Sequence, residues 1–291
     1  MRWLRFGALV VVAGALALFG AACGGAGSNA SSEITADDFD PANFDDPTRI
    51  DNTWFPLAPG TKHVYEGTAL EDDERIAHRV EFVVTDLTKV VGGIRSRVIW
   101  ERDYVEDELV EAELALFAQD NDGNVWHLGQ YPEEYEQGEI VAAPAWFHGL
   151  EGAKAGIAMK VEPHLGTAAY SQGFAPPPIN WVDHAEVHEM GIENCTPVDC
   201  FQDVLVTREF EPDKPDASQL KYYAPGVGNI RVGWFGDKDE NKEVLELVEL
   251  VELDSDGLAE ARAGAMELEA SAYTVSKDVY GKTPPAGALE G

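Results

Sequence analysis

Two histidines have a spacing that could bind a metal. His184 and His188 are four positions apart, which brings two side chains to about 5–6 Å of each other on a helix. On a strand, at about 3.3 Å per residue, the same spacing separates them by about 13 Å. Glu186 and Val187 lie between them in a roughly alternating context, which favours a strand. The pair therefore does not predict a metal site.

An acidic turn resembles the beginning of a calcium-binding loop. Asp120, Asp122 and Asn124 fall at the first, third and fifth positions of such a loop. The sixth position, normally glycine, is Val125, and the twelfth is Tyr131 rather than glutamate. A β-hairpin turn accounts better for these residues, so we expect no metal and no cofactor.

No pattern selects a catalytic residue. The chain lacks a Gly-x-Ser-x-Gly motif, and no serine is paired persuasively with a histidine. Its 53 Asp and Glu residues supply many candidate pairs for carboxylate-dependent hydrolysis, but nothing in the sequence distinguishes one pair from another. A hydrolase that acts on envelope polymers is therefore the alternative to a non-enzymatic protein.

The first 22 residues have the composition of an export signal. Two arginines precede an apolar run of 14 residues, which is shorter than the ~20 residues needed to span a bilayer core. Small residues then lead to Cys23, and glycines follow it, so the segment resembles a bacterial lipoprotein signal in which this cysteine is lipidated. Gly20 stands where an aliphatic residue is usual, which leaves secretion without a lipid as the alternative. We expect a signal peptide over residues 1–22 and a protein that is anchored through Cys23 at the outer face of the membrane, or secreted.

The other two cysteines, Cys195 and Cys200, enclose four residues that include Pro197. A proline turn could bring the two sulfurs together, and a cysteine pair in an exported chain favours a disulfide. Catalytic cysteine pairs usually have a two-residue spacing at the start of a helix, which is absent here. We expect a structural disulfide.

The charge of the chain excludes some partners. Lys and Arg number 21, and the formal net charge is −32; removal of residues 1–22 leaves 269 residues with a charge of −34. Such a surface repels phosphate, which disfavours binding to nucleic acid and electrostatic docking on anionic lipid. The acidity indicates either a salty or calcium-rich habitat or a cationic partner.

The middle of the chain predicts an antiparallel meander. Three strand-like stretches lie between Ile94 and Leu128, and the second turn, at 120–123, is a strong hairpin signal. Before this meander, residues 75–91 predict a strand with apolar side chains on one face and with Arg79 and Glu81 on the other. The pattern loosens after Leu128, and strand-like patterning then recurs in several stretches from residue 181 onward. Over 242–253 glutamate recurs at every third position, a period that fits neither a strand nor a helix cleanly; the valines and the preceding turn favour a strand.

The sequence divides into four segments. After the signal peptide, residues 23–51 are rich in glycine, serine and acids and predict a flexible acidic tether. An antiparallel β domain is expected over 52–253. Over 254–291 we expect a helix with a cap at Ser255 or Asp256, followed by a loose tail.

Five stretches of the sequence carry a resemblance: Thr53–Thr61, Val64–Gly67, Ala118–Trp126, Asp203–Thr207 and Lys221–Gly228. Together they resemble a family of uncharacterised exported bacterial lipoproteins and secreted proteins with a domain of unknown function. The resemblance implies a long antiparallel sheet, curved like that of periplasmic lipoprotein carriers, with a helix against its concave side. The chain departs from the family at Phe174–Trp181, which contains a triple proline, so no ligand site is carried over there.

We therefore predict a mainly β fold, a curved antiparallel sheet or open half-barrel with a C-terminal helix, in a non-enzymatic binding or scaffold protein of the cell envelope. The helix has mostly alanine on its apolar stripe, so it could leave a partly open apolar groove for a lipid-like or aromatic molecule. Trp126, Trp146 and Trp181 are the candidate rim residues, with ordinary core packing as the alternative. A dry apolar groove would favour binding, whereas an acidic pair of raised pKa in a cleft would favour the hydrolase.

Overall fold

Long antiparallel strands make up most of the chain that the computed structural model describes, residues 35–71, 74–239 and 242–288. The signal peptide and Cys23 lie outside these residues. The strands are β1 (Thr61–Glu71), β2 (Glu74–Val91), β3 (Ile94–Val105), β4 (Glu108–Gln119), β5 (Val125–Glu136), β6 (Glu139–Ala142), β7 (Trp146–Phe147), β8 (Lys154–Met159), β9 (Tyr170–Ser171), β10 (Gly173–Phe174), β11 (His184–Cys195), β12 (Cys200–Phe210), β13 (Ser218–Ala224), β14 (Gly228–Phe235), β15 (Val244–Glu252) and β16 (Gly287–Ala288). The helices are η1 (Ala36–Asp38), η2 (Pro41–Asn43), α1 (Ser255–Val275) and α2 (Lys277–Tyr280).

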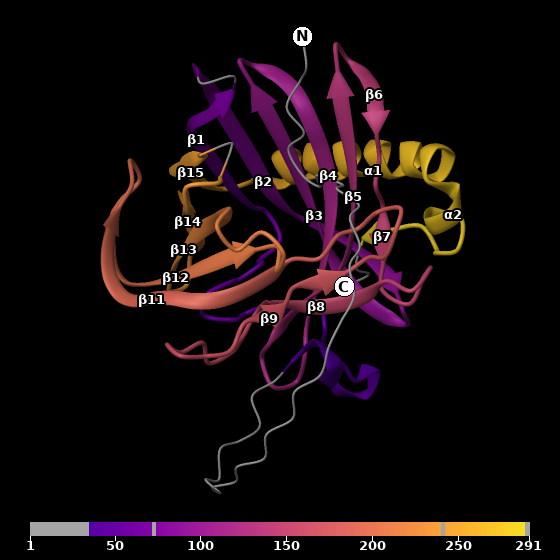
Figure 1. Ribbon diagram of the computed structural model, residues 1–291. Coiled ribbons are helices and arrows are strands. Elements are labelled where there is room, and N and C mark those ends of the chain that lie inside the picture. The colour runs from indigo at the N-terminus through magenta and orange to yellow at the C-terminus, as the bar shows by residue number, and fades with distance from the viewer. Residues whose placement is uncertain (1–34, 72–73, 240–241, 289–291) are drawn as a thin grey trace, which may run out of the picture.

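The strands form one curved sheet that is nearly closed, in the order β10-β8-β5-β4-β3-β2-β1-β15-β14-β13-β12-β11-β9 (Figure 1). Residues 170–174 supply both ends of this order, because β9 pairs with β11 and β10 pairs with β8. At this closure Gly156 of β8 lies so close to the neighbouring chain that a Cβ atom would stand 2.1 Å from the Gly173 nitrogen. The sheet and its single long helix confirm the predicted fold class.

The predicted meander is formed by β3, β4 and β5. Between β3 and β4, Glu106 and Asp107 have φ angles of 50° and 67°, the left-handed pair that matches the twist of a two-residue hairpin. The next turn has Gly123 at φ 95°, so the hairpin interpretation of 120–124 is confirmed. The predicted strand at 242–253 is also present, as β15.

The two faces of the meander are both covered, and α1 covers the outer one. A Cβ atom on Gly264 would lie 2.4 Å from the Trp100 ring, so the helix backbone rests directly on β3. Leu268 is buried in the same outer core, whereas Met266 is exposed. The expected helix against the concave side is therefore wrong, because apolar residues on the outward face of β3 and β4, among them Val98, Trp100 and Leu114, pack against the helix. Its N-cap is Asp254, whose carboxylate accepts from the Gly257 amide at 2.9 Å, rather than the expected Ser255 or Asp256.

Both chain ends pack more closely than the sequence indicated. Within the expected tether, Phe39 lies edge-on to Trp126 at 5.1 Å, and Ile50 is buried in the core. After α1, Tyr280 is fully buried and β16 pairs with β2, so the expected loose tail is in contact with the sheet. No helix in the described part of the chain combines the length and apolarity needed to cross a bilayer.

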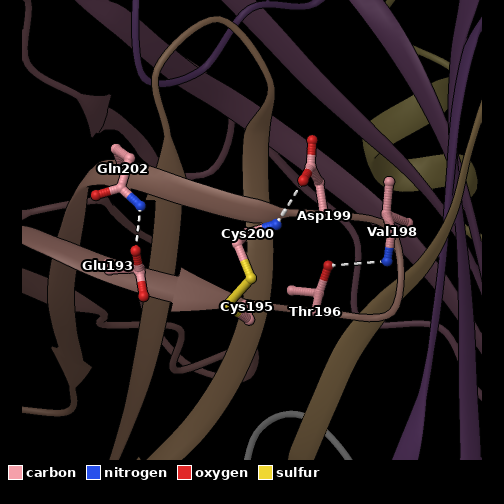
Figure 2. Close-up of a disulfide and its surroundings, with 7 residues drawn as sticks. All are labelled: Glu193, Cys195, Thr196, Val198, Asp199, Cys200 and Gln202. Carbon is pink, nitrogen blue, oxygen red and sulfur yellow. Dashed lines mark hydrogen bonds between the residues drawn. A yellow bond between two sulfur atoms is a disulfide. The ribbon is translucent and has the colours of Figure 1, made fainter.

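A disulfide joins Cys195 and Cys200 at the tip of the β11–β12 hairpin, as predicted (Figure 2). Beside it, the Gln202 side-chain amide donates a hydrogen bond to Glu193 on the facing strand. Both cysteines are exposed. The disulfide therefore closes a hairpin at the protein surface, which fits the predicted structural role.

Candidate functional site

The curved sheet encloses a cavity of about 470 Å³ between β1–β5 on one side and β12–β15 on the other. This volume lies within the range of about 300–1,000 Å³ that is typical of small-molecule sites. Val80 and Phe82 of β2 line it, which confirms the predicted apolar face of that strand opposite Arg79 and Glu81. The other walls differ from the apolar lining that the sequence indicated.

Acidic side chains from neighbouring strands meet on the cavity wall. In the β3–β4 register Glu101 lies opposite Glu113, and Asp103 lies opposite Glu111. Glu111 in turn pairs with Glu134 of β5. Because residues two apart on a strand share a face, all five carboxylates belong to the interior face, and all five line the cavity. Like charges directly opposite each other destabilise a sheet, so this arrangement opposes folding locally.

Burial and mutual repulsion shift the ionisation of this wall. Burial, with the charge of Glu101 added, raises the pKa of Glu113 to about 8. Burial and the charge of Asp103 raise the pKa of Glu101 to about 7, and the pKa of Glu111 also lies well above its ordinary value. Near neutral pH the wall therefore keeps some of its protons.

Two cations inside the molecule compensate part of the negative charge. His78 lies between Asp103, at 2.5 Å from Nε2, and Glu243, at 2.8 Å from Nδ1. The hydrogen bonds to these carboxylates outweigh the burial of the ring and raise the pKa of His78 to about 10. Lys221 of β13 pairs with Glu209 at 2.8 Å.

These two cations leave three carboxylates without a direct partner, although the charge of Lys221 partly offsets the burial of Glu101 and Glu113. Among the hydrogen bonds and ion pairs of the described residues, none is made by the side chains of Glu101, Glu111 or Glu113. In the strand pairing, the residue directly opposite each of the three is another acid. The wall therefore presents acceptor oxygens for which the described chain supplies no donor.

Aromatic rings form the adjoining wall. His127 stacks on Phe117, with ring centroids 5.0 Å apart, and lies edge-on to Trp181 at 5.4 Å; all three residues line the cavity. Trp146 packs behind Trp181 at 4.9 Å but is not part of the lining. Trp126 lies in the outer core with its indole N–H donated to Asp120 at 2.8 Å. Of the three candidate tryptophans, the structure thus brings Trp181 to the cavity, with Trp146 supporting it.

Two buried histidines on the cavity lining each have a ring nitrogen without a hydrogen-bond partner. His63 is 3% exposed; its Nε2–H donates to the Val227 carbonyl at 3.1 Å, and Nδ1 has no partner. His127 is 7% exposed and its Nε2 has no partner. Burial lowers the pKa of both rings, that of His127 to about 3, so both are neutral. In neutral His63 the donor is Nε2, and Nδ1 is therefore an unfilled acceptor.

The described residues contain no group of three His, Cys, Asp or Glu side chains with metal-binding geometry. His184 and His188 lie on β11, as the strand interpretation predicted. The residues that sequence reasoning missed are the cavity carboxylates. Their signal was acid at alternate positions of two consecutive strands, 101 and 103 and then 111 and 113, joined by a tight turn that sets them opposite each other.

No model of a known protein family matches the chain, and no curated protein matches it. Two solved structures are similar over 69% of the chain. One is a protein of Bacteroides fragilis NCTC 9343, proposed to be exported and with a YmcC-like fold (TM-score 0.40, 11% identity, 99% of its chain covered). The other is a proposed lipoprotein of Parabacteroides distasonis ATCC 8503 (TM-score 0.39, 13% identity, 100% covered). Both descriptions match the class of proteins that the sequence resembles, but the similarities are too remote to transfer a function.

Proposed function

We propose that this protein is a non-enzymatic binding protein of the cell envelope, which holds a small ligand in the cavity of its curved sheet. The cavity itself is the observation that carries the proposal. It has the volume of a ligand site, and its lining combines aromatic rings with polar groups that lack partners. A scaffold protein would have no need of such a lining, because each unpartnered buried group costs stability.

The ligand we propose differs from the lipid-like molecule that the sequence favoured. A fatty chain in this cavity would cover Glu101, Glu111 and Glu113 without offering them a hydrogen-bond donor, and burial of polar groups without partners is unfavourable. The ring of Trp181 is compatible with an aromatic or aliphatic group in the ligand. The carboxylates require that the ligand also carry donors.

Filling the cavity should abolish binding. Ala115 is 6% exposed on the interior face of β4, and Ala115→Phe would occupy ligand space at a folding cost of about 1–3 kcal/mol. We expect at least one compound from a panel of small cations, anions and neutral molecules to raise the melting temperature of the native protein. At 100-fold excess over Kd the rise should be about 5 °C or more, and the Ala115→Phe protein should show none.

Ala263→Phe is the matched control, since Ala263 is exposed on α1. It adds the same ring outside the cavity and should respond to ligands as the native protein does. If no compound of any charge class stabilises the native protein, or if Ala115→Phe responds equally, the cavity is not a ligand site.

The proposed location is the outer face of the membrane, with a lipid on Cys23. The small residues before this cysteine and the glycines after it support the assignment. The mass of the intact, membrane-extracted protein should equal that of residues 23–291 plus the lipid. A soluble product with an unmodified Cys23, or a chain that retains residues 1–22, would refute the anchor.

One observation favours the alternative, a hydrolase. Glu101 and Glu113 are carboxylates of raised pKa in a cavity, the property of a general acid. Against it, a glycoside hydrolase needs one protonated and one ionised carboxyl group at a set distance, whereas this wall carries five acids. Release of a chromophore from aryl glycosides by the native protein but not by Glu113→Gln would favour the enzyme over the binding protein.

A further inference from the structure

The chemistry of the cavity wall narrows the ligand to one class. The carboxylates of Glu101, Glu111 and Glu113, which lack direct partners, occupy two adjacent strands in direct register, so the negative charge that they carry when ionised is concentrated in one place. In a partly enclosed cavity water screens such a cluster less than in bulk solution, so a bound cation favours its ionised form. A ligand with two or more ammonium groups can contact more of these three carboxylates at once than a ligand with one ammonium group.

The unfilled histidine acceptor points independently to a ligand with N–H bonds. His63 Nδ1 is buried on the cavity lining as an acceptor without a donor. A metal ion is a poor fit, because the described residues offer no ligand geometry and the volume far exceeds one ion. A quaternary ammonium ligand has positive charge but no N–H, so it would leave His63 unsatisfied.

The aromatic wall favours an aliphatic body between the charged ends. Methylene groups beside an ammonium carry part of its charge and pack favourably on ring faces. Phe117 and Trp181 supply such rings on the cavity lining, next to the acidic wall. Lys221 already pairs with Glu209, which limits the positive charge that the chain itself contributes to this space.

We propose that the cavity binds a linear aliphatic amine with two or more ammonium groups. The proposal rests on the ligand-binding function proposed above and names its ligand class. The strongly acidic outer surface, with a net charge of −32 for the chain, would raise the local concentration of such a cation and speed its entry.

Calorimetric titration of the full mature protein with defined amines tests the proposal. 1,6-Diaminohexane and 1,4-diaminobutane are compared with 1-aminohexane, 1,6-hexanediol and the bis-trimethylammonium analogue of the diaminohexane. We expect at least one diamine to bind about tenfold or more tightly than the monoamine, the diol and the quaternary analogue. Since binding favours ionised carboxylates, titration near pH 6.5 in buffers of different ionisation enthalpy should also reveal protons released by the protein.

Two substitutions separate the cavity from general surface attraction. Glu113→Gln removes an interior carboxylate that lacks a direct partner and should weaken diamine binding about tenfold or more. Glu108→Gln removes the same charge from an exposed position on the same strand and should change the affinity less than twofold. Glu113→Gln is expected to fold, because it relieves like-charge repulsion; if circular dichroism shows otherwise, Glu101→Gln serves the same purpose.

Three outcomes would overturn the proposal: diamines that bind no more tightly than the diol, a quaternary analogue that binds equally well, or equal losses in Glu108→Gln and Glu113→Gln. Suppose that one of the first two outcomes occurs and that Ala115→Phe abolishes the binding of a neutral or anionic compound. The cavity would then still be a ligand site, but for a different class of ligand. Failure of every compound to bind would remove both proposals.

Discussion

Replacing Lys89 with methionine should lower the free energy of unfolding by about 3–5 kcal/mol, because the change leaves a buried carboxylate without its counter-charge. Lys89 is 2% exposed and Glu269 is 5% exposed. The Lys89 ammonium donates to Glu269 at 2.8 Å and to the Pro284 carbonyl at 2.7 Å, and it lies 4.6 Å from the centre of the Tyr280 ring. One side chain of β2 thus holds α1, α2 and the segment that follows them against the outer face.

Equilibrium unfolding in urea, followed by circular dichroism, measures this effect. Lys154→Met is the matched control, since Lys154 is exposed on β8 and its loss should change stability by no more than about 0.5 kcal/mol. The double variant Lys89→Met with Glu269→Met should recover much of the loss, because an apolar pair of similar volume often replaces a buried ion pair at little cost. Equal stability of Lys89→Met and Lys154→Met would show that the pair does not hold the helix in place.

The fold was predictable where local signals agree. Glycines and acids at the turns, alternation in the strands and helical spacing after residue 254 identified the meander, β15 and α1. The side of the sheet that the helix occupies was not predictable in this way. Val98 and Trp100 of β3 and Leu114 of β4 form an apolar face, yet alternation alone does not reveal whether such a face lines an interior or lies beneath a helix.

The site was harder to predict, for a related reason. Charged residues at alternate strand positions usually face solvent, so Glu101, Glu111 and Glu113 had the pattern of an exposed face. They face inward because the sheet closes on itself through residues 170–174, a contact between segments that are distant in sequence. Trp181 reaches the cavity through the same closure, whereas Trp126, on the opposite face of β5, does not. The tight turn between β3 and β4 fixes the register of these two strands, and this register could have predicted that the acids lie opposite one another.

The free energy of unfolding should fall as the pH rises from about 6.5 to about 9, because the cavity carboxylates lose protons that the folded state holds. The ordinary pKa of glutamate is 4.5, and in the folded protein that of Glu101 is raised to about 7 and that of Glu113 to about 8. Between these values the two carboxyl groups bind more protons in the folded state than in the unfolded state, so raising the pH removes the stability that they contribute. Each extra bound proton contributes a slope of about 1.4 kcal/mol per pH unit.

Other groups set the two ends of this window. The pKa of His78 is raised from 6.5 to about 10, so the stability that this histidine contributes is complete below pH 6.5 and is lost as the pH approaches 10. Its effect therefore has the same sign as that of the carboxylates. Interactions with cations outweigh burial and lower the pKa of Glu81, and the Arg262 hydrogen bond lowers that of Asp86. These two contribute stability that is lost as the pH falls through their lowered pKa values. Burial lowers the pKa of His63 and that of His127, the latter to about 3, so these two rings contribute stability that rises with pH up to about 6.5 and offsets the carboxylates there. The maximum is therefore expected near pH 6.

Urea unfolding at a series of pH values, at constant ionic strength and without added amine, tests the prediction. Glu113→Gln has no proton to release at this position, so its stability should fall less steeply between pH 6.5 and 8 and should exceed that of the native protein at pH 8. The Glu108→Gln protein should follow the native curve, since Glu108 is exposed. A diamine that neutralises the wall should flatten the native curve in the same way, because it makes ionised carboxylates favourable in the folded state. Native stability that rises from pH 6.5 to 8 would contradict the presence of an acidic cluster with raised pKa values in the cavity.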